Sequence, residues 1–206
     1  MADRIKRRMV QRRADLCKKE VTFFRLRPII LRRSFSLMNR IALLLTMALF
    51  GHHASAEPLS VSAKAPDVTA TNQNGQPVDF AKIYEKGLTL VYFYPKADTP
   101  GCTAQACSLR DSFATLSGEG LTVLGVSKDS VEAQKKFQEK YKIPFDLIAD
   151  SDGTVAKAFG VETIPIVGMT KRQSFIVKDG KIAWTSLSAK TGEAAQEVQT
   201  ALDKLR

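Results

Sequence analysis

Two cysteines lie close together just after a strongly apolar stretch of the sequence. The segment PKADTPGCTAQAC (95–107) follows LTLVYFY, so that Cys102 stands three residues after Thr99 and five before Cys107. Pro100 favours the first turn of a helix, because a proline lacks the N–H that would have no partner there. A thiol in such a turn lies near free N–H groups and the positive end of the helix dipole, which favour the reactive thiolate. Cys102 is therefore the candidate nucleophile.

Histidine is too scarce in this chain for most cysteine enzymes. Its two histidines are His52 and His53, and none occurs in residues 57–206. A Cys-His protease or acyltransferase needs an imidazole base, so this region excludes that class. Two cysteines alone also make a poor zinc shell, and we expect no metal and no cofactor. A thiolate without a general base suits the weak O–O bond of a peroxide, whose departing oxygen needs mainly electrostatic stabilisation.

The apolar periodicity predicts the elements that position this loop. Continuous apolar runs at 88–94 and 121–127 predict buried strands, and each is followed by an amphipathic helix. The first helix is expected to stop at Gly118 or Gly120 and the second to be capped by Ser130. Strand-helix-strand-helix order favours parallel strands with right-handed crossovers.

The second half of the domain has a different order of predicted strands and helices. A short strand at 145–150 and a short helix at 152–160 precede a β-hairpin across Asp179-Gly180 and a closing helix capped at Thr191. Earlier, VDFAKIYEKG (78–87) is interpreted as a short connection after an Asn74-Gly75 turn. This layout predicts an α/β fold, a thioredoxin-like sandwich with a mixed central β-sheet flanked by helices.

The segment YFYPKADTPGCTAQACSLRD resembles the active site of the peroxiredoxins, whose pattern Pro-x-x-x-Thr-x-x-Cys falls here on Pro95, Thr99 and Cys102. The second cysteine resembles the Q-type subgroup, also called bacterioferritin comigratory protein. The resemblance covers essentially all of 57–206, including GVSKDSVEAQKKFQEKY and KRQSFIVKDGKI. It implies a thiol-specific peroxidase that reduces hydrogen peroxide and organic hydroperoxides to water and alcohols in antioxidant defence.

The resemblance also implies a role for each matching residue. Cys102 would be the peroxidatic cysteine, oxidised to a sulfenic acid, and Cys107 the resolving cysteine that forms an intramolecular disulfide with it. Thr99 would place its hydroxyl between the sulfur and the peroxide, and Pro95 would shield the thiolate from water. Arg172 would hold the thiolate and the peroxide oxygens. A thioredoxin or a thioredoxin-like dithiol protein would then reduce the disulfide.

Each assignment has a simpler alternative. Thr99 would otherwise cap a helix, Pro95 end a strand, and Arg172 be a surface charge. Lys171 is adjacent to Arg172, so the choice between them rests on the register of RQSF against an Arg-x-Thr-Phe-like pattern, in which this chain has Ser174.

The spacing of Cys102 and Cys107 raises a geometric question. On one continuous helix, five residues rise about 7.5 Å, which exceeds the Cα separation of ~7 Å that a disulfide tolerates. This argues against a plain structural disulfide. We expect the first turns of the helix to melt before Cys107 attacks the oxidised Cys102. An intramolecular reaction needs no partner subunit, so we expect a monomer.

The positive charge of the chain is confined to its beginning. Residues 1–56 hold 13 Lys and Arg against three acidic residues, which leaves 18 basic and 18 acidic residues of the 31 and 21 in the whole chain. The neutral remainder argues against a nucleic-acid partner. MNRIALLLTMALFGHHASA (38–56) has a basic head, a short apolar run and a small-x-small ending, which predicts a secretory signal and export, in a bacterium to the periplasm.

Residues 1–37 fit neither a packed helix nor an ordinary signal head, and we hypothesise that translation begins at Met38. The alternatives are a nucleic-acid-binding tail, an organelle presequence, an uncleaved membrane anchor, and a cytoplasmic protein if the signal is not used. The predicted divisions are 1–37, 38–56 and a peroxiredoxin domain at 57–206. The rival activities for that domain are a secreted thiol-disulfide oxidoreductase, which expects Cys-x-x-Cys, and a peroxide-sensing redox relay.

Overall fold

The computed structural model describes residues 57–164 and 166–206. The predicted basic extension and signal peptide, with Cys17, lie outside the described residues. The strands form one seven-stranded sheet in the order β2-β1-β5-β4-β3-β6-β7. The strands are β1 (Thr69–Asn72), β2 (Pro77–Asp79), β3 (Thr89–Phe93), β4 (Thr122–Ser127), β5 (Asp146–Ala149), β6 (Gln173–Lys178) and β7 (Lys181–Ser186).

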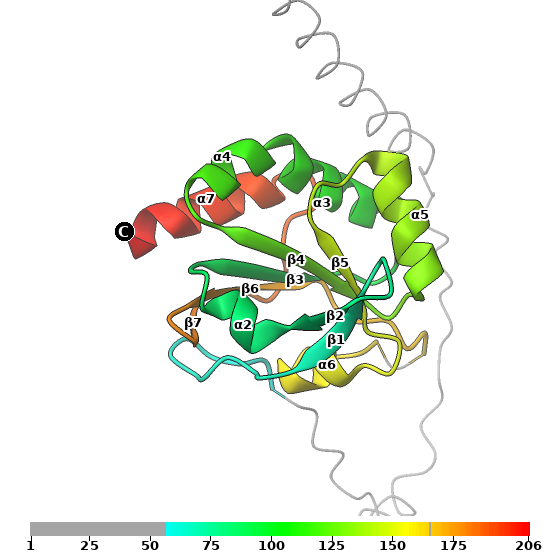
Figure 1. The fold of residues 1–206 in the computed structure, drawn as a ribbon, viewed down its shortest axis with the longest axis horizontal. Coiled ribbons are helices and arrows are strands. Elements are labelled where there is room, and N and C mark those ends of the chain that lie inside the picture. Colours follow the sequence, from blue (N-terminus) through cyan, green and yellow to red (C-terminus); the bar gives the residue numbers. More distant parts are fainter. Residues whose placement is uncertain (1–56, 165) are drawn as a thin grey trace, which may run out of the picture.

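Helices cover both faces of this sheet (Figure 1). The helices are α2 (Phe80–Tyr84), α3 (Pro100–Asp111), α4 (Phe113–Gly118), α5 (Val131–Tyr141), α6 (Thr154–Ala158) and α7 (Ala194–Leu205). Buried residues of α3, α5 and α7 share one apolar cluster with the sheet, whereas those of α2 and α6 belong to a second cluster. The architecture is therefore a three-layer α/β sandwich of the thioredoxin type, as predicted.

Strand β3 is the centre of the sheet and is buried along its whole length. It pairs parallel with β4 and antiparallel with β6, which makes the sheet mixed. Its side chains alternate between the layers: Leu90 and Tyr92 join the cluster of α3, whereas Val91 and Phe93 join the opposite one. The end of β3 therefore delivers the chain directly to the start of α3.

Most predicted elements are confirmed. The two buried strands are β3 and β4, and β4 pairs parallel with β5. The side chain of Ser130 caps α5 by accepting from the Ala133 amide at 3.3 Å. The hairpin of β6 and β7 turns at Asp179 and Gly180, both with positive φ.

The helix after Cys102 differs from the prediction, because it is interrupted at Ser112. This residue has φ −99° and ψ 1°, ends α3 and precedes α4, which stops at Gly118. Serine competes with helical hydrogen bonding and favours such end positions. Both cysteines nevertheless lie on the unbroken α3.

Two other expectations were wrong. Helix α7 begins after Glu193 and has no side-chain cap, so Thr191 does not cap it. The Ala195 amide instead donates to Ser108 Oγ of α3 at 3.1 Å, a tertiary contact that replaces a local cap.

The segment 78–87 was predicted to be a short connection, but it contains the end of β2 and the whole of α2. Asn72 Oδ1 accepts from the amides of Asn74 and Gln76, both at 3.0 Å, and Gly75 has φ +74°, which together turn β1 back into β2. Asp79 then caps α2 by accepting from the Lys82 amide at 3.2 Å.

Candidate active site

Cys102 is the third residue of α3, and only 2% of its surface is exposed. Thr99 is the N-cap and Pro100 the first helical residue, so the sulfur lies in the turn whose N–H groups have no partner within the helix. The first backbone bond of the helix runs from the Thr103 amide to the Thr99 carbonyl at 2.8 Å. The predicted position at the strand-to-helix junction is confirmed.

Arg172 is the cation that meets the sulfur. Its Nη2 donates to Cys102 Sγ at 3.3 Å, and its Nη1 donates to Gln105 Oε1 at 2.5 Å. Gly101 makes room for the guanidinium, because a Cβ at that position would lie 3.3 Å from Nη2. A planar cation bound at two points is held in orientation as well as in position. This arrangement places a positive charge beside the sulfur.

The neighbouring lysine faces another partner. Lys171 forms an ion pair with Glu162, and both side chains are substantially exposed. Arg172 is half-buried and directly precedes β6, which pairs with β3 so that Gln173 lies opposite Phe93. The register of RQSF therefore brings Arg172, and not Lys171, to the cysteine loop.

Thr99 and Pro95 lie on the same loop but do not bond the sulfur. The Thr99 hydroxyl donates to the Lys96 carbonyl at 3.0 Å, and its side chain makes no capping bond to α3. Pro95 is half-buried and follows Tyr94, whose carbonyl accepts from the buried Thr170 hydroxyl at 2.9 Å. The Thr99 side chain and the residue before Pro95 are therefore both held by hydrogen bonds to backbone carbonyls in the loop that precedes α3.

Cys107 is buried on the same helix, five residues after Cys102. Cys102 is a free cysteine in this structure, so the two are not bonded to each other. Both cysteines lie on the continuous helix α3, along which five residues rise about 7.5 Å, too far for a disulfide without a change in the backbone.

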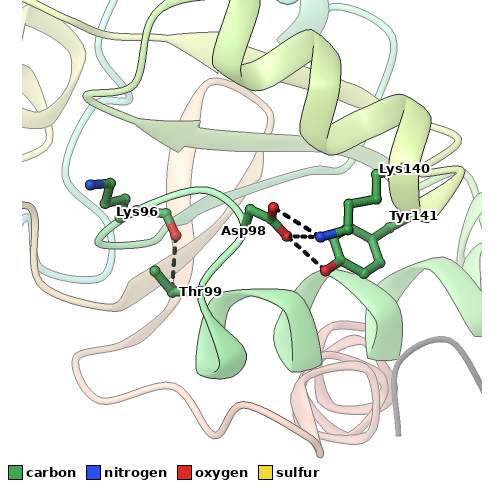
Figure 2. A network of polar contacts seen from close by, with 5 residues as sticks. All are labelled: Lys96, Asp98, Thr99, Lys140 and Tyr141. Atoms are coloured by element: carbon green, nitrogen blue, oxygen red, sulfur yellow. Dashed lines mark hydrogen bonds and ion pairs between the residues drawn. The ribbon is translucent and has the colours of Figure 1, made fainter. Parts of the chain in front are cut away.

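Two carboxylates fix the loop between β3 and α3. Asp129 Oδ2 accepts from the Ala97 amide at 2.7 Å and from the Ser127 hydroxyl at 2.6 Å. Asp98, which has φ +57°, turns its carboxylate toward the end of α5, where it accepts from Lys140 Nζ at 2.9 Å and from Tyr141 Oη at 2.7 Å (Figure 2). The segment before Cys102 is therefore fastened to β4 and α5.

Gln105 and Tyr92 are buried near Cys102 and were not anticipated from the sequence. Gln105 follows Cys102 by three residues, a spacing that places both on one face of a helix and could have revealed it. Its Nε2 has no hydrogen-bond partner within the described part of the chain, nor does the Tyr92 hydroxyl. Tyr92 comes from β3, where its aromatic type gave no sign of a polar role.

Burial raises the pKa values of two tyrosines on this side of the sheet. Burial raises the pKa of Tyr92 well above its ordinary value, and the nearby Tyr94 and Cys102 raise it further, whereas Arg172 acts in the opposite direction. Burial also raises the pKa of Tyr94, whose hydroxyl donates to Gln134 Oε1. Both phenols are therefore neutral near the candidate nucleophile at neutral pH.

Residues 57–164 and 166–206 contain neither a candidate metal cluster nor a candidate membrane-spanning helix. Within these ranges there is no group of three His, Cys, Asp or Glu side chains arranged to hold a metal ion. In the same part of the chain, no helix has the length and apolar character needed to cross a membrane.

Comparison with known proteins gives a consistent result. The family model described as the AhpC/TSA family matches residues 61–185. The chain is 40% identical to the chloroplastic peroxiredoxin Q of Sedum lineare over 118 residues, which are 57% of this chain and 63% of that protein. It is also 40% identical to the chloroplastic peroxiredoxin Q of Arabidopsis thaliana over 119 residues, 57% of this chain and 55% of that protein. The matched region thus spans less than two thirds of either relative.

A solved structure extends the similarity. The crystal structure of peroxidoxin BcpB from Mycobacterium tuberculosis superposes with a TM-score of 0.68 and 29% identity, covering 72% of this chain and 99% of that one. The family match includes β3, the cysteine loop, α3 and Arg172. The chain belongs to the AhpC/TSA family, as a peroxiredoxin of the Q type, the group also called bacterioferritin comigratory protein.

Proposed function

We propose that this protein is a thiol peroxidase in which Cys102 reduces hydrogen peroxide and organic hydroperoxides. The observation that carries the proposal is the buried Cys102 sulfur in the first turn of α3, 3.3 Å from Arg172 Nη2. A thiolate stabilised in this way can attack a peroxide without a general base. The membership of the chain in a peroxiredoxin family supports the same reaction.

The first step forms one S–O bond and breaks one O–O bond. The Cys102 thiolate attacks the terminal peroxide oxygen, gives a sulfenic acid, and releases an alkoxide or hydroxide that takes a proton to become alcohol or water. Arg172 Nη2 lies beside the sulfur and stabilises the charge that moves onto the departing oxygen. Thr99, three residues before Cys102, would turn its hydroxyl from the Lys96 carbonyl toward the peroxide.

Cys107 completes the cycle in our proposal. Its thiol attacks the Cys102 sulfenic sulfur, an intramolecular disulfide forms, and water leaves. Because α3 separates the two residues along its axis, the first turns must unwind for this step. A dithiol protein of the thioredoxin type then reduces the disulfide by thiol-disulfide exchange and becomes oxidised itself.

A peroxidase assay with thioredoxin and its reductase tests this cycle. We expect Cys102→Ser to abolish turnover, and Cys107→Ser to consume one equivalent of peroxide without turnover. Cys17→Ser changes the one cysteine of the sequence that the proposed cycle does not use, and this variant should turn over like the wild type. Full turnover by Cys102→Ser would refute the assignment, and rapid oxidation with no recycling by any dithiol protein would favour a redox relay.

The cellular setting is a separate part of the proposal. The composition of residues 38–56 supports cleavage after Ala56 and export, with residues 57–206 as a monomeric mature domain. N-terminal sequencing of the protein from a periplasmic fraction should begin at Glu57, and light scattering should give the mass of one domain. A peptide covering Arg4 to Arg33 in the mature protein would contradict this processing.

A further inference from the structure

Tyr141, the last residue of α5, contacts the chain on both sides of the two cysteines. Its hydroxyl donates to Asp98 Oδ1 at 2.7 Å, and its carbonyl accepts from Arg110 Nη1 at 2.7 Å (Figure 2 for the Asp98 side). Asp98 lies four residues before Cys102, and Arg110 lies three residues after Cys107. One residue of another helix therefore fastens both ends of the segment that carries the cysteines.

Lys140 reinforces the contact with Asp98. Its Nζ lies 2.9 Å and 3.0 Å from the two carboxylate oxygens and 5.0 Å from the centre of the Tyr141 ring. Because Lys140 and Asp98 are about half exposed, their ion pair alone contributes little. We call Asp98, Arg110, Lys140 and Tyr141 together the Tyr141 clasp.

Two of the four residues of the clasp, Tyr141 and Arg110, are buried. Tyr141 is 2% exposed and Arg110 is 6% exposed. The Tyr141 ring packs against Phe137 with a centroid distance of 5.3 Å, in the same apolar cluster as Cys102 and Cys107. Hydrogen bonds that are shielded from water contribute more to holding two helices together than exposed pairs do.

We propose that the Tyr141 clasp sets how often α3 unwinds and thereby divides the Cys102 sulfenic acid between disulfide formation and further oxidation. This inference rests on the proposed function. Unwinding of the first turns must displace the chain between Asp98 and Cys107, and the clasp holds α3 and the loop before it against α5. Tyr141 is a positioning residue in this account, because it acts on Cys102 only through α3.

The two fates of the sulfenic acid need different states of α3. In the unwound state, the Cys107 thiol attacks the sulfenic sulfur and releases water, which leaves a disulfide. In the folded state, the sulfenate attacks a second peroxide, breaks its O–O bond, and yields a sulfinic acid and water or an alcohol. Only the second reaction depends on peroxide concentration, so their ratio reports the population of the unwound state.

The test measures this ratio in the full chain carrying Cys17→Ser. The reduced protein is exposed to rising hydrogen peroxide while a thioredoxin system recycles it, and the sulfinic and disulfide forms are quantified by mass spectrometry. Tyr141→Phe removes the hydroxyl and keeps the packed ring. Loss of this hydrogen bond should raise the peroxide concentration that gives half sulfinic acid about fivefold. Asp98→Asn keeps a residue tolerant of positive φ but makes the acceptor of this hydrogen bond neutral, so it should shift the value in the same direction by a smaller factor.

Tyr84→Phe is the matched control. Tyr84 is a buried tyrosine of the opposite apolar cluster, and within the described residues its hydroxyl has no hydrogen-bond partner. It should leave the half-sulfinic concentration unchanged, and the rate of the first oxidation should be the same in all three variants. An unchanged or lowered value for Tyr141→Phe and Asp98→Asn, or an equal rise in Tyr84→Phe, would overturn the role of the clasp.

Failure of the proposed function would look different. A chain without the clasp substitutions that forms neither sulfenic acid nor disulfide would refute the peroxidase itself. A chain that forms the disulfide normally, with variants that do not shift the ratio, would refute only the role of the Tyr141 clasp.

Discussion

Arg172 Nη2 donates to Cys102 Sγ at 3.3 Å, although 70 residues separate the two in the sequence. The sheet brings them together, because β6 runs antiparallel to β3 and Gln173 lies opposite Phe93. The residue before β6 is thus placed beside the loop that leaves β3 for α3. The pairing of β3 with β6 therefore positions both the candidate nucleophile and the guanidinium beside it.

Replacing Arg172 by glutamine should slow the oxidation of Cys102 by hydrogen peroxide about tenfold to a hundredfold, the effect expected for a hydrogen bond to a charged group. The reason is the loss of positive charge beside the sulfur and the departing oxygen. Rapid mixing with hydrogen peroxide, followed by alkylation of the remaining thiol at set times and mass spectrometry, measures this rate.

Lys171→Gln is the matched control for this change. It removes the adjacent positive charge, but that charge pairs with Glu162 on the surface. Its oxidation rate should stay close to that of the wild type. A comparable loss of rate in both variants would mean that net charge near the site matters and the Arg172 contact does not.

Thr99→Val should reduce the same oxidation rate by about tenfold, because the hydroxyl that would bind the peroxide is lost. Thr99→Ser retains a hydroxyl at the position and should react nearly as fast as the wild type. The two rates, measured with matched protein concentrations, distinguish a role in binding peroxide from one in shaping the loop. Equal rates for valine and serine would exclude a direct role of the hydroxyl.

The central features of the site could be predicted from the sequence because they are local. Cys102, Thr99 and Pro100 form one strand-to-helix junction, and their types and spacing specify its backbone. The hairpin at Asp179-Gly180 and the buried strand β3 were likewise marked by turn residues and by apolar runs. Such features need no knowledge of distant partners.

Contacts between elements could not be anticipated in the same way. Ser108 of α3 binds the first turn of α7, which removed the need for the predicted cap at Thr191. Asp98 meets Lys140 and Tyr141 of α5 only because the sheet places the end of α5 beside the cysteine loop. These contacts depend on how the helices pack against the sheet, which cannot be derived from a single sequence.

The four tyrosines of the chain should titrate together with unfolding. Tyr84, Tyr92, Tyr94 and Tyr141 all have a raised pKa, with burial as the largest cause. The folded state holds the phenol protons more tightly than the unfolded state does. The tyrosines therefore add to the free energy of unfolding below about pH 10, and this contribution is lost as the pH rises toward their raised pKa values. The tyrosinate absorbance should therefore stay low past pH ~10 and rise in one step with the loss of circular dichroism. Ionisation near pH ~10 in the folded protein would contradict the burial.

Gly125→Ala should destabilise the fold through the core next to the site. A Cβ at this position would lie 2.7 Å from the Tyr92 hydroxyl oxygen and 2.8 Å from Leu147 Cδ2. Overpacking of this kind costs typically about 1 to 3 kcal/mol, which urea denaturation can measure. Gly118→Ala is the control, because nothing lies within 4 Å of its added Cβ and its φ is not positive. An undiminished free energy of unfolding in Gly125→Ala would show that Tyr92 moves freely.

The peroxidase activity of Cys102 is tested first by the intact mass of the reduced full chain, carrying Cys17→Ser, after one equivalent of hydrogen peroxide. A parallel sample contains a trap for sulfenic acid. We expect the loss of two hydrogen atoms as Cys102 and Cys107 join, a trapped adduct on Cys102, and recovery of the original mass with thioredoxin and its reductase. An unchanged mass after prolonged exposure would mean that Cys102 is not an activated thiolate, and would refute the proposed peroxidase.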